Sequence, residues 1–230
     1  MYFQHSPRLW SEHPGLVAGV LSASGIDASP APDLSPYFAT AKERLGSSSE
    51  SDLPEIQAWR RAFASMGLKP TQYRCASEAL LRRFRKESTL PRLHPLVDLC
   101  NAISLAFAVP VAALDLSKIT GDLEVRHATG DESYLTFGGD IEHPAPDEVI
   151  FADGAGRSHA RRWTNRQSGL SVVRDTTTDV LIVAEGLHDT AAEDVPRLIE
   201  TVAKELAAHW GTSPEPAILS HASPRFTVHS

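Results

Sequence analysis

The stretch that decides the fold runs from Gly67 to Asp115 and reads GLKPTQYRCASEALLRRFRKESTLPRLHPLVDLCNAISLAFAVPVAALD. Its first half is basic: between Arg60 and Arg92 the chain has nine basic and two acidic residues, a net charge of +7. The whole chain of 230 residues has a net charge of −7, so the remainder carries −14. An acidic protein with one concentrated basic segment indicates a specific anionic partner rather than general adhesion.

Apolar spacing around this basic run predicts three helices. The first covers 52–66, because Pro54 is tolerated in a first turn and apolar residues follow at spacings of three and four. The second begins at Ser77, and the third, 96–107, is apolar nearly all round and is therefore expected to be buried. The basic side chains expected to point outward from the second helix are Arg82, Arg83, Arg85 and Lys86. They form either a solvated helix face or a contact surface for the anionic partner.

The buried third helix carries two polar side chains on one face, Asp98 and Asn101, which lie three residues apart. A polar side chain on a buried helix needs a partner to offset its desolvation. Two explanations are open: the pair caps a neighbouring loop, or it lines a binding pocket.

The rest of the chain alternates between strand-like and helical segments. A buried strand is predicted over 15–26, a short helix over 36–46 and a long helix over 190–211. Short strands with glycine turns are predicted over 123–126, 134–137, 148–153, 159–168, 171–174 and 180–184. We therefore expect one domain over residues 1–211 with its core at about 50–190, and a C-terminal tail over 212–230 that lies on the surface or is disordered.

Composition and motif searches exclude several classes of function. No apolar run reaches the ~18 residues of a membrane span, and the first ten residues lack the layout of a signal peptide. Two cysteines make no disulfide scaffold, which indicates a reduced, cytosolic protein. The nucleotide-binding glycine loops, GxSxG and HExxH are absent, and the ten histidines show no zinc spacing. We expect neither a cofactor nor a metal, and oligomeric state is left open.

Two segments of the sequence carry candidate binding or catalytic side chains. Residues 161–168 combine two arginines, Trp163 and a dense set of donors in Asn165, Arg166, Gln167 and Ser168. Guanidinium groups bind phosphates and carboxylates, and indole offers a stacking surface, although an exposed strand with a core tryptophan explains the pattern equally. Glu185 is the first charge after the apolar run 180–184. It either marks the emergence of that strand into solvent or is a desolvated carboxylate able to activate water.

Several ordered motifs resemble the editing module of the bacterial phenylalanyl-tRNA synthetase β subunit, which is called the B3/B4 domain. They are LVDLCN (96–101), VPVAALD (109–115) and GDLEVR (121–126). The chain is more similar to freestanding B3/B4 proteins, which share the runs at 67–83 and 163–168. The resemblance covers about residues 50–190.

The resemblance implies an α+β fold, a β-sandwich of unusual topology flanked by helices, here with N- and C-terminal helical extensions. It also implies hydrolysis of a wrong amino acid from an aminoacylated tRNA in trans, without metal or cofactor. For this reaction we expect Glu185 to orient the water, while Asn101 or the backbone near Arg166 stabilises the oxyanion. The substrate-binding residues would be Asn165, Gln167, Ser168, Asp98 and Ala112. The residues that hold the tRNA would be Arg74, Arg82, Arg83, Arg85 and Lys86.

The chain departs from the synthetase at two pocket positions. Ala112 stands where the synthetase has a histidine, and Asn165-Arg166 align with a pair of glycines. Both changes indicate specificity for an amino acid other than tyrosine. The alignment also leaves Val183 as an alternative to Glu185. Two other functions stay open: a tRNA- or RNA-binding module without catalysis, and a small-molecule binder or hydrolase that kept the fold.

Overall fold

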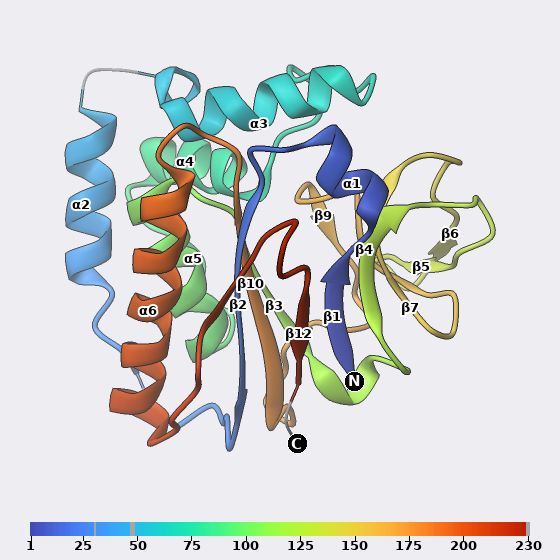
Figure 1. Ribbon diagram of the computed structural model, residues 1–230. Coiled ribbons are helices and arrows are strands. Elements are labelled where there is room, and N and C mark those ends of the chain that lie inside the picture. Colours follow the sequence, from blue (N-terminus) through green and yellow to red (C-terminus); the bar gives the residue numbers. More distant parts are fainter. Residues whose placement is uncertain (30, 47–48, 229–230) are drawn as a thin grey trace.

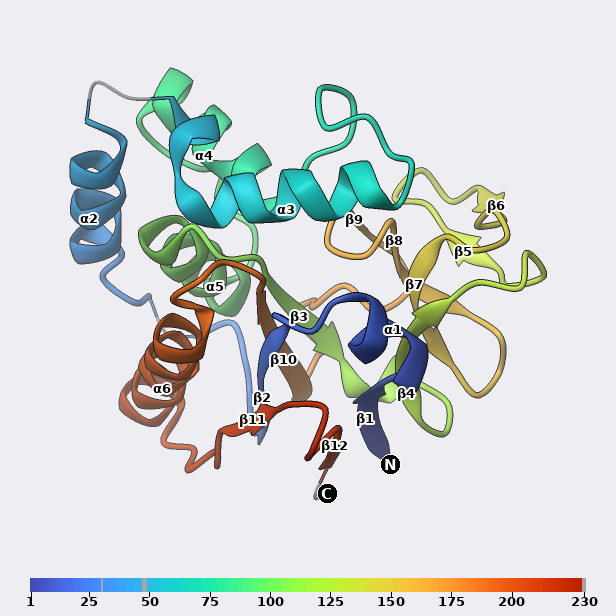
Figure 2. The same ribbon diagram turned by 45° about the horizontal axis from the view of Figure 1, so that its top comes forward.

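The computed structural model describes residues 1–29, 31–46 and 49–228. Over these residues two β-sheets pack against each other, with helices on one side of the sheets and across one end, so the expected α+β fold is confirmed (Figure 1, Figure 2). The helices of the described ranges are α1 (Pro7–Glu12), α2 (Ser35–Leu45), α3 (Pro54–Ser65), α4 (Ala76–Glu87), α5 (Pro95–Phe107) and α6 (Ala191–Trp210), with short 3-10 turns at Glu50–Asp52 and Leu116–Lys118.

The smaller sheet has the strand order β11-β2-β10-β3. Its strands are β2 (Val17–Ser24), β3 (Val111–Asp115), β10 (Asp179–Gly186) and β11 (Ala217–Leu219). Strand β10 is buried on both faces: Val180 and Ile182 pack in the core shared with α5 and α6, whereas Leu181 and Val183 pack in the core between the sheets. Because side chains alternate along a strand, Glu185 points between the sheets.

The larger sheet has the order β12-β1-β4-β7-β8-β9. Its strands are β1 (Tyr2–His5), β4 (Leu123–His127), β7 (Val149–Asp153), β8 (Ser158–Arg161), β9 (Arg166–Gln167) and β12 (Arg225–Thr227). Strand β1 runs parallel to β4, with Phe3 opposite Leu123 and His5 opposite Val125. Beside this sheet lies the hairpin of β5 (Tyr134–Leu135) and β6 (Ile141–Glu142). The N-terminal strand therefore carries His5 toward the inter-sheet core.

The expected helical extensions are present at both chain ends as α1, α2 and α6, but both ends also contribute strands, and the C-terminal tail differs from the expectation. The N-terminal region contributes β1 and β2 in addition to two helices (Figure 1). Beyond α6, β11 pairs with β2 and β12 pairs with β1, so residues 217–227 close one edge of each sheet. The expected surface tail is thus corrected to a pair of edge strands, whose backbone groups find partners more than 190 residues away. Residues 229–230 of the expected tail lie outside the described residues.

The predicted helices and most predicted strands are present. However, 159–168 is two short strands, β8 and β9, joined by a turn at 162–165, and 171–174 is not a strand. This segment runs between β9 and β10 as a loop, and Ser171 accepts a hydrogen bond from the Asp115 backbone N–H at 2.9 Å. The segment is held in place by the burial of the Val173 side chain rather than by pairing with a neighbouring strand. No helix in the described ranges is long and apolar enough to cross a membrane.

Both cysteines are buried and unpaired. Burial raises the pKa of the Cys75 thiol to about 11 and that of the Cys100 thiol to about 12. Both side chains are therefore neutral thiols at physiological pH, and neither provides a thiolate nucleophile.

Gly19 on β2 allows α6 to pack closely on the smaller sheet. A Cβ at this position would lie 3.0 Å from Val195 Cγ1 and 3.1 Å from Ile199 Cβ. Substitution Gly19→Val is therefore expected to lower the free energy of unfolding by about 1–3 kcal/mol through overpacking, measured by urea denaturation. The control Gly15→Val should change it by less than about 0.5 kcal/mol, because the nearest atom to a Gly15 Cβ is 3.9 Å away. Equal effects would contradict this account of the packing.

Candidate functional site

Glu185 lies near the end of β10 and is only 2% exposed. Trp163 Nε1 donates a hydrogen bond to its Oε1 at 2.8 Å, and His5 Nε2 lies 2.6 Å from the same oxygen. Within the described part of the chain Oε2 has no donor. One carboxylate oxygen is thus fixed by two rings, while the other is available to a molecule in the adjoining cavity.

The cavity beside Glu185 lies between the two sheets and has a volume of ≈ 70 Å³. Its walls are mostly apolar, with Ala112 and Val183 from the smaller sheet and Phe151 and Ala160 from the larger one. Polar atoms come from Glu185 on one wall and from residues 164–167 on another. The volume suits a small side chain or a few waters, since one water needs ~10–15 Å³.

The turn between β8 and β9 holds the polar wall in place. Arg162 and Trp163 have φ angles of 48° and 58°, a conformation that non-glycine residues seldom adopt. Three hydrogen bonds maintain it: Trp163 N–H to Val149 O at 2.7 Å, Ala76 N–H to Thr164 O at 2.8 Å, and Asn165 Nδ2 to Arg74 O at 2.7 Å. The structure therefore keeps a strained turn at the cavity, which is where strain is often found to serve function.

Four predicted substrate or catalytic residues converge with Glu185, namely Ala112, Asn165, Arg166 and Gln167. Gln167 Nε2 donates to Ala113 O at 2.9 Å, which fixes the amide across the gap between the sheets. Arg166 is exposed, stacks over the Tyr134 ring at 5.5 Å and lies 3.4 Å from Glu142. Arg166 must therefore break these two contacts before its guanidinium can bind a ligand at the mouth of the Glu185 cavity.

Two other predicted site residues, Ser168 and Asp98, form hydrogen bonds that stabilise the fold. Ser168 is fully buried, and its hydroxyl donates to Leu135 O and accepts from Leu170 N–H. Asp98 accepts a hydrogen bond from the Leu93 N–H at 2.9 Å, so it ties down the loop before α5. The loop-capping explanation therefore describes Asp98, and neither residue lines the Glu185 cavity.

Asn101 lies in a different cavity from Glu185. It lines a second hollow of ≈ 380 Å³ together with residues of α5 and of the loop 172–175. The two cavities are neighbours, because Val111 and Gln167 line both. The expected meeting of Asn101, Arg166 and Glu185 in one cavity is corrected to two adjoining cavities divided by Gln167.

The basic helix α4 begins at the Glu185 cavity, which Ala76 lines. At 1.5 Å per residue its basic side chains follow about 9–15 Å further along the helix. The buried Glu50 pairs with Arg82 at 2.9 Å and with Arg85 at 3.0 Å, while Arg83 pairs with Glu87. The predicted cationic residues therefore lie further along a helix that begins at the cavity, and neighbouring carboxylates offset much of their charge.

Arg74 and Arg161 also serve the fold. Arg74 lies 3.4 Å from the fully buried Glu78, which also binds Arg60. Arg161 forms a two-pronged pair with Glu148, with both N···O distances at 2.8 Å. Burial alone would raise the pKa of Glu148, but Arg161 outweighs burial and holds it below the ordinary value.

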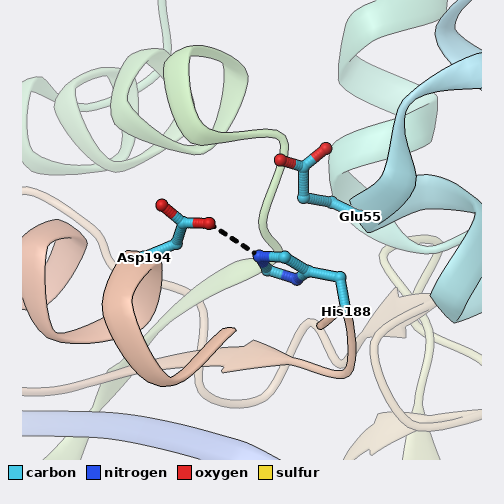
Figure 3. Close-up of side chains that lie close together, drawn as sticks. All are labelled: Glu55, His188 and Asp194. Atoms are coloured by element: carbon cyan, nitrogen blue, oxygen red, sulfur yellow. Dashed lines mark hydrogen bonds and ion pairs between the residues drawn. The ribbon is translucent and has the colours of Figure 1, made fainter. Parts of the chain in front are cut away.

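A third cluster joins α3 to α6 and consists of Glu55, His188 and Asp194 (Figure 3). One potential ligand atom from each lies within 4.8 Å of the others. Arg44 already binds Glu55 at 2.6 Å, and Arg197 pairs with Asp194. His188 Nε2 lies 3.0 Å from Asp194, and its buried Nδ1 has no partner in the described ranges. Metal-bound histidines usually donate from their other nitrogen, so we interpret the cluster as an ion-pair network.

The sequence analysis missed His5, the second partner of Glu185. It reaches Glu185 from β1, whose pairing partners are 120 or more residues away in sequence. The signal within the sequence is the alternation of Phe3 and His5 in a short extended segment before Pro7. Trp163, which was expected either to stack on a ligand or to fill the core, is fully buried and donates to Glu185.

These observations define an α+β domain with a buried carboxylate in a cavity between two sheets. The model of the B3/4 domain family matches residues 58–202, which is more than half of the chain. The chain belongs to the B3/4 domain family, which confirms the resemblance found in the sequence.

The chain is also similar to curated phenylalanine–tRNA ligase β subunits. It is 30% identical to that of Shewanella oneidensis over 116 residues, 50% of this chain and 14% of the relative. It is 33% identical to that of Thermobifida fusca over 97 residues, 42% of this chain and 11% of the relative. The chain thus spans about one seventh or less of these relatives.

Among solved structures, an N-terminal fragment of the phenylalanyl-tRNA synthetase β subunit from Pyrococcus horikoshii is similar with a TM-score of 0.47. Its sequence identity is 11%, and the match covers 92% of this chain and 49% of that chain.

Proposed function

We propose that this protein hydrolyses the ester bond between a wrongly attached amino acid and its tRNA, acting in trans. One observation carries the proposal: Glu185 has one oxygen fixed by His5 and Trp163 and the other available to a cavity of side-chain size. Membership in the B3/4 family, and similarity to a tRNA ligase subunit, support tRNA as the class of partner.

The arrangement suits a non-covalent mechanism. The amino-acid side chain enters the apolar cavity, and the Oε2 atom of Glu185 accepts a hydrogen bond from the attacking water. As the water oxygen bonds to the ester carbonyl carbon, its proton passes to Glu185, and the ribose oxygen then leaves and takes up a proton. Hydrogen-bond donors of residues 164–167, which line the cavity, would stabilise the developing oxyanion.

The small cavity favours a small amino acid. Ala112 adds little bulk, but Val183, Phe151 and Trp163 close the walls around a volume of ≈ 70 Å³. Asn165 and Arg166 occupy the mouth, where the resemblance places two glycines. We therefore propose a substrate with a side chain smaller than that of tyrosine.

The test is a release assay against a panel of tRNAs, each esterified with a noncognate amino acid. The proposal predicts accelerated release from at least one small-side-chain ester over the spontaneous rate. Absence of acceleration for every member, while a synthetase editing domain is active in the same buffer, contradicts it.

The basic face of α4 yields a salt-dependent prediction. In Arg83→Glu/Lys86→Glu we expect weaker tRNA binding and a slope of log K against log salt that is smaller by about 2, because two phosphate contacts are lost. The measurement is filter binding at several salt concentrations. The control is Lys118→Glu. Lys118 is exposed and follows the end of β3, and its substitution should leave the slope unchanged. An unchanged slope in the double variant would place the tRNA elsewhere.

A small-molecule binder or hydrolase is the second candidate. The pairing of Arg82 and Arg85 with Glu50 favours it, because these ion pairs reduce the charge offered to a polyanion. The same titration separates the two candidates: tRNA affinity that is absent even at low ionic strength supports the small-molecule function.

A further inference from the structure

The second cavity, beside α5, is large enough for a ligand of its own. Its volume of ≈ 380 Å³ falls within the range of about 300–1,000 Å³ that is typical of small-molecule sites. It shares the lining residues Val111 and Gln167 with the Glu185 cavity, so the two cavities are neighbours. Two parts of a single substrate can therefore occupy the two cavities at once.

His94 lines this second cavity and has an unused donor. The side chain is 3% exposed, and its Nδ1 accepts the Leu96 N–H at 3.2 Å. The proton of the neutral ring is therefore on Nε2, which is buried and has no partner in the described part of the chain. Burial lowers the pKa of His94 despite the nearby Asp175, Asp98 and Asp27, which favours this neutral form. A buried N–H without a partner calls for an acceptor on a ligand.

The rim of the cavity offers a surface for a flat ring. Phe137, in the turn between β5 and β6, lines the cavity and is nevertheless 66% exposed. Aromatic side chains of this kind stack on nucleic-acid bases. Asn101 adds an amide that can donate and accept, and Arg174 adds a positive charge at the rim. Asp175 adds a negative charge there, which favours ribose hydroxyls over additional phosphate.

We propose that this second cavity binds the terminal adenosine of the tRNA, with the base against Phe137 and a base or ribose acceptor taking the His94 Nε2 proton. The inference rests on the proposed function, because it supplies the remainder of the substrate whose amino acid enters the Glu185 cavity. The ester bond would then lie at the Gln167 partition, within reach of both cavities. It also gives Asn101 a ligand-binding role apart from Glu185.

The experiment is an amide-resonance NMR titration of the full chain with adenosine 5′-monophosphate, compared with ribose 5-phosphate. We expect resonances around the second cavity to shift with the nucleotide, and binding of ribose 5-phosphate to be at least about tenfold weaker, because base stacking supplies most of the affinity. Equal affinities, or shifts confined to another face, overturn the proposal.

Two variants test the named contacts. Phe137→Ala should weaken nucleotide binding by about 5- to 100-fold. His94→Asn should weaken it by about 3- to 10-fold, while asparagine still caps α5. The control Ile141→Ala removes another exposed apolar side chain of the same hairpin, outside the cavity, and should bind like the unaltered protein. Unaltered binding in both test variants overturns the proposal.

The binding and hydrolysis measurements distinguish a failure of the adenosine site from a failure of the proposed deacylase function. Nucleotide binding that depends on Phe137 without ester hydrolysis supports this site and refutes the deacylase. Ester hydrolysis combined with nucleotide binding that ignores Phe137 and His94 supports the deacylase and refutes this site.

Discussion

Glu185→Gln should lower the rate of aminoacyl-tRNA hydrolysis by about 10²–10⁴-fold. Glutamine keeps the size of the side chain. Its amide oxygen can accept the hydrogen bond that the Trp163 indole N–H donates to Oε1 in the unaltered protein. It cannot take a proton from water, so the general base is lost while the cavity keeps its shape. Single-turnover release of the amino acid from the best substrate of the panel measures the effect.

The matched control for this variant is Glu205→Gln. Glu205 is a partly buried carboxylate on α6 that accepts a hydrogen bond from the Tyr37 hydroxyl at 2.5 Å, and it does not line the Glu185 cavity. It should retain the full rate. Full activity in Glu185→Gln, with native circular dichroism, would remove Glu185 from the mechanism.

Arg161→Met should lower the free energy of unfolding by about 3–5 kcal/mol at neutral pH, measured by urea denaturation. Arg161 is 6% exposed, and its removal would leave the buried carboxylate of Glu148 without its paired guanidinium. The control Arg83→Met removes an exposed partner of Glu87 and should cost at most about 1 kcal/mol.

The effect of Arg161→Met should depend on pH. Arg161 holds the pKa of Glu148 below its ordinary value of 4.5 despite burial, so its stabilisation is present above that value and is lost as the pH falls. Without Arg161, burial raises the pKa of Glu148, and protonation at low pH relieves the buried charge. The difference between variant and unaltered protein should therefore shrink as the pH falls below about 4.5. A difference that stays constant would show that Glu148 is not the cause.

Local patterns in the sequence were sufficient for helices α2 to α6 and for β10. The apolar run 180–184 places a strand there, and period-two alternation then places Glu185 in the inter-sheet space. The polar segment 161–168 was also predicted to be part of a site. What the pattern did not show is which members of that segment face the cavity, because Ser168 and Arg161 are held by partners distant in sequence.

Contacts between distant segments account for the features that were not predicted. Strand β1 has four residues, and β11 and β12 have three each, so none carries a long alternating pattern. Their stability comes from pairing across most of the chain. Likewise the arginines of α4 look unpaired in the local sequence, but Glu50, 32 residues before Arg82, neutralises part of their charge.

The most direct test is a crystal structure of the protein with a non-hydrolysable analogue in which an amide joins the best amino acid of the panel to adenosine. The account predicts the side chain in the cavity beside Glu185, the amide at the Gln167 partition and adenine against Phe137. An amino-acid side chain found outside the inter-sheet cavity, with Glu185 in contact only with His5 and Trp163, would contradict it.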